Sequence, residues 1–190
     1  MKIGIYGGSF NPVHFGHVGL AKWVVENTDL DELWLLVSPN NPLKPAGILA
    51  PEEERLVAVR EAVKGIQGLV VSDFEFSLPR PSFTANTLRA LQTAYPTYEF
   101  TLVIGEDNLA IFNQWHEYEY ILANFRIFVY PRISSRQAER VASADVDILK
   151  TSDCRLRIPY SKDVIFLASA PYFDISSTEL RAAQTTSRSL

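Results

Sequence analysis

Cysteine and long hydrophobic runs are scarce in this chain of 190 residues. Its one cysteine, Cys154, excludes an intramolecular disulfide and gives no sign of an oxidising compartment. Apolar runs such as residues 33–37 and 164–170 are far shorter than the ~18 residues of a membrane span. Glycines at positions 7 and 8 interrupt the N-terminal apolar run too early for a signal peptide. We therefore expect a soluble, cytoplasmic protein without a membrane segment.

Positive charge is also in short supply. The chain has 18 Lys and Arg against 22 Asp and Glu, a formal net charge of −4 at pH 7. A protein that coats nucleic acid needs a basic face, so we expect no nucleic-acid partner. Three histidines and one cysteine leave few soft ligands for a protein-held metal, and we expect none. With 47% hydrophobic and 21% charged residues the chain can build one core, which excludes a disordered or fibrous class.

Short apolar segments typical of buried strands alternate with amphipathic helical segments along the chain. The pattern predicts strands at residues 2–6, 33–37, 69–71, 100–104, 126–129 and 164–168. It predicts helices at 15–27, from 51 onward, and at 84–94, 108–122 and 176–183, with a surface helix plus loops within 133–162. This alternation indicates an α/β fold, a single Rossmann-like domain over residues 1–190 whose mostly parallel, twisted sheet has helices on both faces. Ligands of such sheets bind at the carboxyl ends of the strands.

The turn after the first predicted strand carries the clearest chemical signal. It contains neither Gly-x-Gly-x-x-Gly nor a Walker phosphate loop. Instead, a glycine pair allows a ligand to approach the backbone, and His14 and His17 follow at the start of a helix. Residues three apart share a helix face, and the free N–H groups at a helix N-terminus suit a phosphate. The alternatives are a capping or packed surface role for these histidines, or a metal pair.

The segment from Gly7 to His17, Gly-Gly-Ser-Phe-Asn-Pro-Val-His-Phe-Gly-His, resembles the signature of the nucleotidylyltransferase superfamily. It is most similar to that of nicotinate-nucleotide adenylyltransferases. Histidine at position 14 distinguishes the two related families, because phosphopantetheine adenylyltransferases usually have threonine there.

A second matching segment lies near the C-terminus. Ser176 to Arg181, with Ile175 ahead of it, resembles the family's Ile-Ser-Ser-Thr-x-x-Arg motif. Ser176 and Glu179 also form a capping box, which is the purely structural interpretation. Ser177 and Arg181 lie four apart on one helix face, where a hydroxyl and a guanidinium would make a second phosphate site.

A third segment, Gly105 to Trp115, resembles the family's Gly-x-Asp…Trp pattern. Asp107 could accept hydrogen bonds from a ribose hydroxyl, and Trp115 offers a flat face on which a pyridine ring could stack. Core packing is the alternative for Trp115.

Two further positions match the family less completely. Residues 81–88 resemble its Ser-Tyr-Thr-x-x-Thr-Leu segment with Phe83 in place of tyrosine, and the alternative for Thr84 is a simple N-cap. Lys44 resembles the lysine of a Pro-x-x-Pro-His-Lys loop, although Leu43 replaces the usual histidine.

The resemblance implies adenylyl transfer from ATP to nicotinate mononucleotide, giving deamido-NAD and pyrophosphate by direct displacement. Mg²⁺ would arrive with ATP, held mainly by phosphates and water. Another acceptor (nicotinamide mononucleotide, phosphopantetheine or FMN) and a non-catalytic nucleotide-binding domain are the alternatives. Neither the choice between the two pyridine mononucleotides nor the oligomeric state has a signature in the sequence. Family members usually continue beyond the position of Arg181, so a chain ending at Leu190 is expected to be trimmed or a short member.

The resemblance also assigns residues to roles. The implied catalytic residues are His14, His17, Lys44 and Arg181. The implied ATP contacts are Gly7, Gly8, Ser9, Phe10, His14, His17, Gly105, Asp107, Ile175, Ser176, Ser177 and Arg181. The implied mononucleotide contacts are Asn11, Lys44, Thr84 and Trp115. Because charge acts over only ~8–10 Å in salt, we expect a mostly negative surface with one compact positive cleft.

Overall fold

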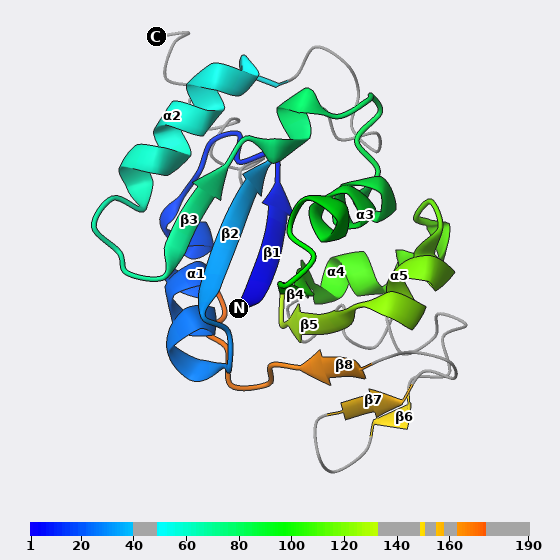
Figure 1. Cartoon of the computed structure of the whole chain (residues 1–190). Coiled ribbons are helices and arrows are strands. Elements are labelled where there is room, and N and C mark those ends of the chain that lie inside the picture. Colours follow the sequence, from blue (N-terminus) through cyan, green and yellow to red (C-terminus); the bar gives the residue numbers. More distant parts are fainter. Residues whose placement is uncertain (40–48, 133–148, 151–154, 158–162, 174–190) are drawn as a thin grey trace, which may run out of the picture.

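The computed structural model describes residues 1–39, 49–132, 149–150, 155–157 and 163–173 (Figure 1). Their strands form one sheet in the order β3-β2-β1-β4-β5-β8-β7-β6. Six strands run parallel: β1 (Lys2–Gly8), β2 (Glu32–Val37), β3 (Leu69–Ser72), β4 (Glu99–Gly105), β5 (Arg126–Tyr130) and β8 (Asp163–Phe166). The predicted α/β fold with a mostly parallel sheet is therefore confirmed.

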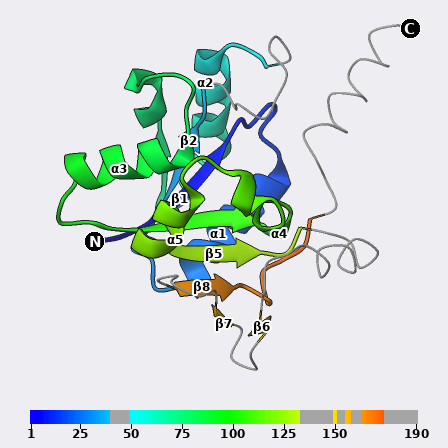
Figure 2. The same cartoon turned by 90° about the vertical axis from the view of Figure 1, so that its right-hand side faces the viewer.

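Helices cover both faces of the sheet (Figure 1, Figure 2). On one face, α1 (Phe15–Asn27) and α2 (Glu52–Ala62) share a buried core with β2 residues such as Leu33 and Leu35. On the other face, α3 (Thr84–Ala94), α4 (Glu106–Leu109) and α5 (Tyr118–Asn124) share a core with Trp34 and Leu36. This alternation along β2 is the two-residue period of a strand buried on both sides. None of the described helices is both long and apolar enough to cross a bilayer.

The prediction of a helix over residues 108–122 is wrong in its continuity. The chain instead forms the end of α4, the 3-10 helix η2 (Phe112–Gln114) and then α5. Glu117, the residue before α5, has a left-handed backbone with φ of 51° and interrupts the helix. The break lets both Phe112 and Ile121 bury their side chains in the same core. Tertiary packing has overridden a local helical pattern.

The prediction of a surface helix plus loops at 133–162 is also wrong where the structure describes this stretch. Two short strands lie there, β6 (Leu149–Lys150) and β7 (Arg155–Arg157), and they extend the edge of the sheet in antiparallel fashion beyond β8. The sequence Arg155-Leu156-Arg157 alternates charged and apolar residues, which is the period of a strand. An alternating pattern of only three residues is too short to be distinguished from part of a helical turn.

The sheet order reverses at β1, which pairs with β2 on one side and β4 on the other. A crevice forms at such a switch point, outside the carboxyl ends of the two central strands. Here those ends are Gly8 of β1 and Gly105 of β4. Between β3 and α3 the chain adds the 3-10 helix η1 (Phe74–Ser77), whose Glu75 approaches the same region while Phe74 packs against the core.

At the opposite edge, Asp29 joins the amino ends of β1 and β5. Its carboxylate accepts hydrogen bonds from Lys2 Nζ at 2.8 Å and Arg126 Nη1 at 2.9 Å. Hydrogen bonds from Arg126 and then from Lys2 lower the pKa of Asp29 to about 2. The carboxylate is half exposed, so screening by solvent limits what the network contributes to stability.

We predict that Asp29→Asn lowers the free energy of unfolding at pH 7 by about 0.5–1 kcal/mol. A carboxyl whose pKa is lower in the folded state stabilises the fold above its unfolded pKa of about 4 and loses this effect as pH falls towards 2. The deficit of the variant, measured by urea unfolding at several pH values, should therefore shrink below pH 4. Glu26→Gln, which removes the exposed pair with Lys22, is the control. A deficit that stays constant down to pH 2 would contradict this role of Asp29.

Candidate active site

A cavity of about 420 Å³ opens at the switch point, and most of the described residues predicted for the site line it. These are Gly7, Gly8, Ser9, Phe10, His17, Thr84, Gly105, Asp107 and Trp115. A smaller neighbouring cavity is lined by His14 and shares His17 and Arg132 with the larger one. Segments far apart in the sequence therefore meet around one cleft.

The remaining predicted residues are not at the cavity or cannot be placed. Lys44, Ile175, Ser176, Ser177 and Arg181 lie outside the described residues, so their roles stay predictions. Asn11 is buried in the turn after β1, where its Oδ1 accepts a hydrogen bond from the backbone N–H of Ala50 at 3.2 Å. It does not line either cavity, and its mononucleotide contact also stays a prediction.

The turn after β1 is tightly shaped. Phe10 has a left-handed backbone with φ of 42°, a conformation that is unfavourable for a bulky residue and persists only when its surroundings impose it. Its buried ring packs edge-on against Tyr6 and against His17, with centroids 5.7 and 5.1 Å apart. A Cβ at Gly8 would come within 3.0–3.2 Å of the Phe10 ring, so a side chain there would press against the ring and shift it by a few tenths of an ångström.

His14 and His17 lie on one side of the helix start, as their spacing predicts. Their rings stack with centroids 3.6 Å apart. The backbone N–H of His14 donates to Nδ1 of His17 at 3.3 Å, so a neutral His17 carries its proton on Nε2 and can donate it. His14 is the N-cap residue of α1, and neither of its buried ring nitrogens has a hydrogen-bond partner among the described residues.

The protonation state of His14 is compatible with binding of an anion. Burial, and after it the charge of Arg132, lowers the pKa of His14. The imidazole is therefore neutral near pH 7 before a ligand binds. An incoming phosphate would favour the protonated form and would supply the partner that the ring nitrogens lack.

Arg132, two residues beyond β5, is a cleft residue that the sequence analysis missed. Its Nη1 lies 3.6 Å from Oδ2 of Asp107, and its side chain lines both cavities. The hydroxyls of Tyr6 and Tyr130 lie 3.5 Å apart beside it, and burial raises the pKa of both, so no phenolate neutralises the guanidinium. The strand predicted at 126–129 contained the signal, because side chains just beyond a parallel strand face the ligand edge.

The wall formed by η1 and α3 holds a second missed residue, Glu75. Its side chain is buried, and Oε1 accepts a hydrogen bond from Thr87 Oγ1 at 2.9 Å. Burial raises the pKa of this carboxyl. Two buried polar atoms of this cavity have no hydrogen-bond partner among the described residues: Oγ of Ser82 and Nε1 of Trp115. Buried polar groups are seldom left unpaired, so these two atoms are available to pair with a ligand or with water in the cavity.

Thr84 begins α3 but is not its cap. Phe83 holds the N-cap position, and its carbonyl accepts hydrogen bonds from the backbone N–H groups of Asn86 and Thr87 at 3.0 and 3.1 Å. The interpretation of Thr84 as an N-cap is therefore wrong, because the helix starts one residue earlier than capping by Thr84 would require. Thr84 instead lines the cavity near Trp115.

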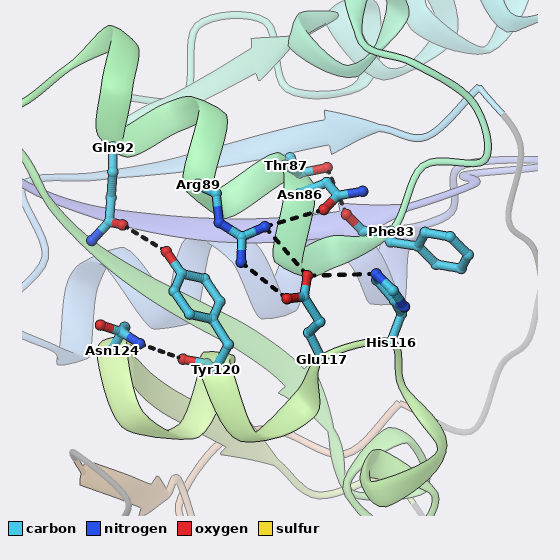
Figure 3. A network of polar contacts seen from close by, with 9 residues as sticks. All are labelled: Phe83, Asn86, Thr87, Arg89, Gln92, His116, Glu117, Tyr120 and Asn124. Carbon is cyan, nitrogen blue, oxygen red and sulfur yellow. Dashed lines mark hydrogen bonds and ion pairs between the residues drawn. The ribbon is translucent and has the colours of Figure 1, made fainter.

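A network of polar contacts fixes the two segments that carry Thr84 and Trp115 (Figure 3). Glu117 accepts two hydrogen bonds of 3.3 Å from Arg89 of α3, and Nε2 of His116 lies 3.5 Å from the same carboxylate. The His116 ring packs against Phe83 at 4.5 Å. The Arg89 guanidinium also lies 4.1 Å above the Tyr120 ring. The α3 and α5 sides of the cleft are thus held together at the edge of the cavity, which Phe83 and His116 line.

The described residues contain no group of three or more His, Cys, Asp or Glu side chains arranged to hold a metal ion. What they do present is a donor-rich end, formed by the start of α1 with His17 and Arg132, and an aromatic end at Trp115. Such a cleft can bind a polyphosphate next to a planar ring.

Comparison with known proteins identifies the family to which the chain belongs. The family model described as cytidylyltransferase-like matches residues 5–183. A relative from Flavobacterium psychrophilum, named a probable nicotinate-nucleotide adenylyltransferase, is 42% identical over 181 residues, covering 95% of this chain and 85% of the relative. One of the same name from Bacteroides fragilis is 41% identical, covering 100% and 85%.

A solved structure shares the fold. The Plasmodium falciparum nicotinic acid mononucleotide adenylyltransferase complexed with NaAD superposes with a TM-score of 0.69 at 16% identity, covering 95% of this chain and 82% of that one. The fold, the motifs around the cleft and the extent of the sequence match all indicate the same family. The chain belongs to the cytidylyltransferase-like family and, within it, to the nicotinate-nucleotide adenylyltransferases.

Proposed function

We propose that the protein transfers the adenylyl group of MgATP to nicotinate mononucleotide, releasing pyrophosphate and forming deamido-NAD. The observation that carries this proposal is the cleft itself. It joins the stacked histidines of α1, on one face of the sheet, to Trp115 and Thr84 beside α3 and α5 on the other face. A triphosphate and a pyridine ring could thus lie at its two ends. The names of the relatives support this choice of substrates.

The chemical step needs alignment more than proton transfer. The attacking group is the 5′-phosphate of the mononucleotide, which is already anionic near pH 7, so no general base is required. One of its oxygens forms a bond to the α-phosphorus of ATP as the bond to the bridging oxygen of pyrophosphate breaks. The protein lowers the barrier by holding the two phosphates in line and by stabilising the charge that develops.

In this proposal His17 and His14 contact the phosphates of ATP. Nε2–H of His17 donates to the reacting phosphate, and His14 supplies ring nitrogens that have no partner among the described residues. Arg132 adds positive charge at the same end of the cleft. Lys44, Ser177 and Arg181 would complete the triphosphate site, with Ile175 and Ser176 beside them. Mg²⁺ enters as part of MgATP, coordinated mainly by phosphate oxygens and water.

The adenosine and the mononucleotide occupy the rest of the cleft. Asp107 accepts a hydrogen bond from a ribose hydroxyl of ATP, and Gly105 leaves room for the nucleoside to approach β4. Trp115 stacks on the pyridine ring, while Thr84 and Asn11 support the mononucleotide pocket. We also propose that the chain forms a single domain and acts in the cytoplasm.

The direct test is product analysis with the purified protein. With MgATP and nicotinate mononucleotide, we expect equal amounts of pyrophosphate and deamido-NAD, with inversion of configuration at a chiral α-phosphorus because the displacement is single and in line. Retention would indicate a covalent enzyme intermediate. The absence of pyrophosphate with every mononucleotide would favour a non-catalytic nucleotide-binding domain.

Trp115→Ala should raise KM for the mononucleotide by about 5–100-fold and leave KM for ATP within about threefold of its original value. Loss of aromatic stacking is worth ~1–3 kcal/mol per ring. Steady-state kinetics with each substrate varied in turn measures the effect. Trp115→Phe should keep most of the affinity, and Trp23→Ala, which changes a tryptophan that lines neither cavity, is the matched control. Equal increases in both KM values would contradict the proposed stacking of Trp115 on the pyridine ring.

A further inference from the structure

Arg55 is a buried cation next to the cleft for which neither the motifs nor the proposed chemistry accounts. It lies on α2, which packs against β2 and β3 (Figure 1), and only 3% of its surface is exposed. Among the described residues no carboxylate lies within ion-pair distance of its guanidinium. A charge removed from water in this way is costly unless hydrogen bonds replace the water.

Four backbone carbonyls take the place of that water. Nη1 of Arg55 donates to Ser9 at 2.6 Å and to Ser38 at 2.8 Å, Nη2 donates to Pro39 at 3.1 Å, and Nε donates to Ala50 at 2.9 Å. One planar group therefore fastens three parts of the chain to one another: the turn after β1, the end of β2 and the residues that precede α2. The rigid fork of a guanidinium can serve several carbonyls at once, which the ammonium of lysine cannot match in geometry.

The bond to Ser9 falls at a strained point of the turn. The next residue is Phe10, with its left-handed backbone, and the residue after it, Asn11, accepts a hydrogen bond from the N–H of Ala50. The backbone N–H of Ser38 also donates to Gly8 at 2.9 Å. An unfavourable φ angle persists only when neighbouring contacts impose it, and here these bonds do so on both sides of Phe10.

The conformation of Phe10 decides where its ring lies, and that ring supports His17. The two rings meet edge to face with centroids 5.1 Å apart, while Nδ1 of His17 faces the backbone of His14. A continuous path of contacts thus runs from Arg55 through Ser9 and Phe10 to the imidazole of His17. Its steps are the hydrogen bond from Arg55 to Ser9, the peptide bond between Ser9 and Phe10, and the ring contact between Phe10 and His17.

We propose that Arg55 is a positioning residue for adenylyl transfer, because its clamp on the Ser9 turn sets the orientation of the His17 imidazole through Phe10. The expected effect on the reaction rate rests on the proposed function. The structural coupling between Arg55 and His17 can be measured without any substrate. Misplacement of a catalytic group by about 1 Å can cost on the order of 10²-fold in rate. Arg55 should therefore act on kcat more than on substrate affinity.

The test compares Arg55→Lys and Arg55→Met with the wild-type protein. Arg60→Met is the matched control, because Arg60 lies on the same helix but is exposed and pairs with Asp73, at 3.2 Å. The chain has three histidines, so each imidazole can be followed by NMR across a pH titration. In both Arg55 variants we expect the resonances of His17 to move and those of His116, at the other end of the cleft, to stay.

Kinetics supply the second measurement. We expect kcat of Arg55→Lys to fall by about 10–100-fold, with KM for ATP changed by less than about threefold. If neither Arg55 variant folds, Phe10→Leu tests the same path from its other end and should move His17 but not His116.

Two results would overturn the proposal. One is a folded Arg55→Lys protein with unmoved His17 resonances. The other is a moved His17 resonance with wild-type kcat. Failure of the wild-type protein to make a dinucleotide would instead refute the proposed function, and the NMR comparison would still report on the coupling.

Discussion

His17→Ala should lower kcat by about 10²–10⁴-fold while KM for either substrate changes little. The reason lies in the proposed role of His17, in which its Nε2–H donates to a phosphate on which charge grows as the α–β bridge breaks. The hydrogen bond from the His14 backbone to Nδ1 fixes this tautomer, so the donor is in place before the substrate arrives. A donor that is already oriented contributes to the transition state without a reorganisation cost.

The measurement is kcat at saturating MgATP and mononucleotide, for protein whose thermal unfolding shows that it is folded. His17→Gln retains an amide N–H at a similar distance from the backbone and should recover part of the lost rate. Turnover within about threefold of wild type in a folded His17→Ala protein would exclude the proposed role.

Gly105→Ala should raise KM for ATP by about 10–100-fold with a much smaller effect on KM for the mononucleotide. Gly105 ends β4 with φ of −77°, which alanine adopts without strain, so the effect is purely steric. An added Cβ would collide with Oδ1 of Asp107 and would lie 3.1 Å from Cδ of Arg132. Both side chains would have to move away from the nucleoside. Loss of one hydrogen bond to a charged group costs ~1.5–3 kcal/mol, which gives the expected range.

Asp107→Asn separates the steric effect from the hydrogen bond. It keeps the size of the side chain but weakens it as an acceptor, so KM for ATP should rise in the same direction by a smaller factor. An unchanged KM for ATP in a folded Gly105→Ala protein would show that the nucleoside does not approach β4.

The sequence predicts the elements of this fold well where a strong period coincides with a buried strand or an amphipathic helix. The buried run in β2 and the amphipathic helix at Thr84–Ala94 are examples. The cleft follows from the same reasoning, because parallel strands bring Gly8 and Gly105 to one edge. The prediction was wrong at residues 108–122, where burial of Phe112 and Ile121 breaks a helix that local pattern alone would continue.

The cleft residues that the sequence analysis missed depend on contacts that no local pattern carries. Arg55 follows three glutamates and has the sequence context of a solvated helix face, yet it is buried under four carbonyls. Glu75 is isolated among aromatic residues, and only the packing of η1 against α3 shows that its carboxyl reaches Thr87. Spacing could place His14 and His17 on one side of a helix but could not reveal that the rings stack.

The net charge of −4 limits the partners of the whole surface but not those of the cleft. Among the described residues, the start of α1 and Arg132 already place positive potential at the end of the cleft proposed to bind phosphate. Lys44 and Arg181 are predicted to add to it. The compact positive cleft on a negative surface therefore remains a prediction for the whole chain.

The most direct test of the central claim is a comparison of kcat/KM for different acceptors with MgATP held saturating. The acceptors are nicotinate mononucleotide, nicotinamide mononucleotide, phosphopantetheine and FMN. We expect nicotinate mononucleotide to give the highest value, with phosphopantetheine and FMN near background. A higher kcat/KM with phosphopantetheine or FMN than with either pyridine mononucleotide would contradict adenylyl transfer to nicotinate mononucleotide, as would the absence of turnover with all four.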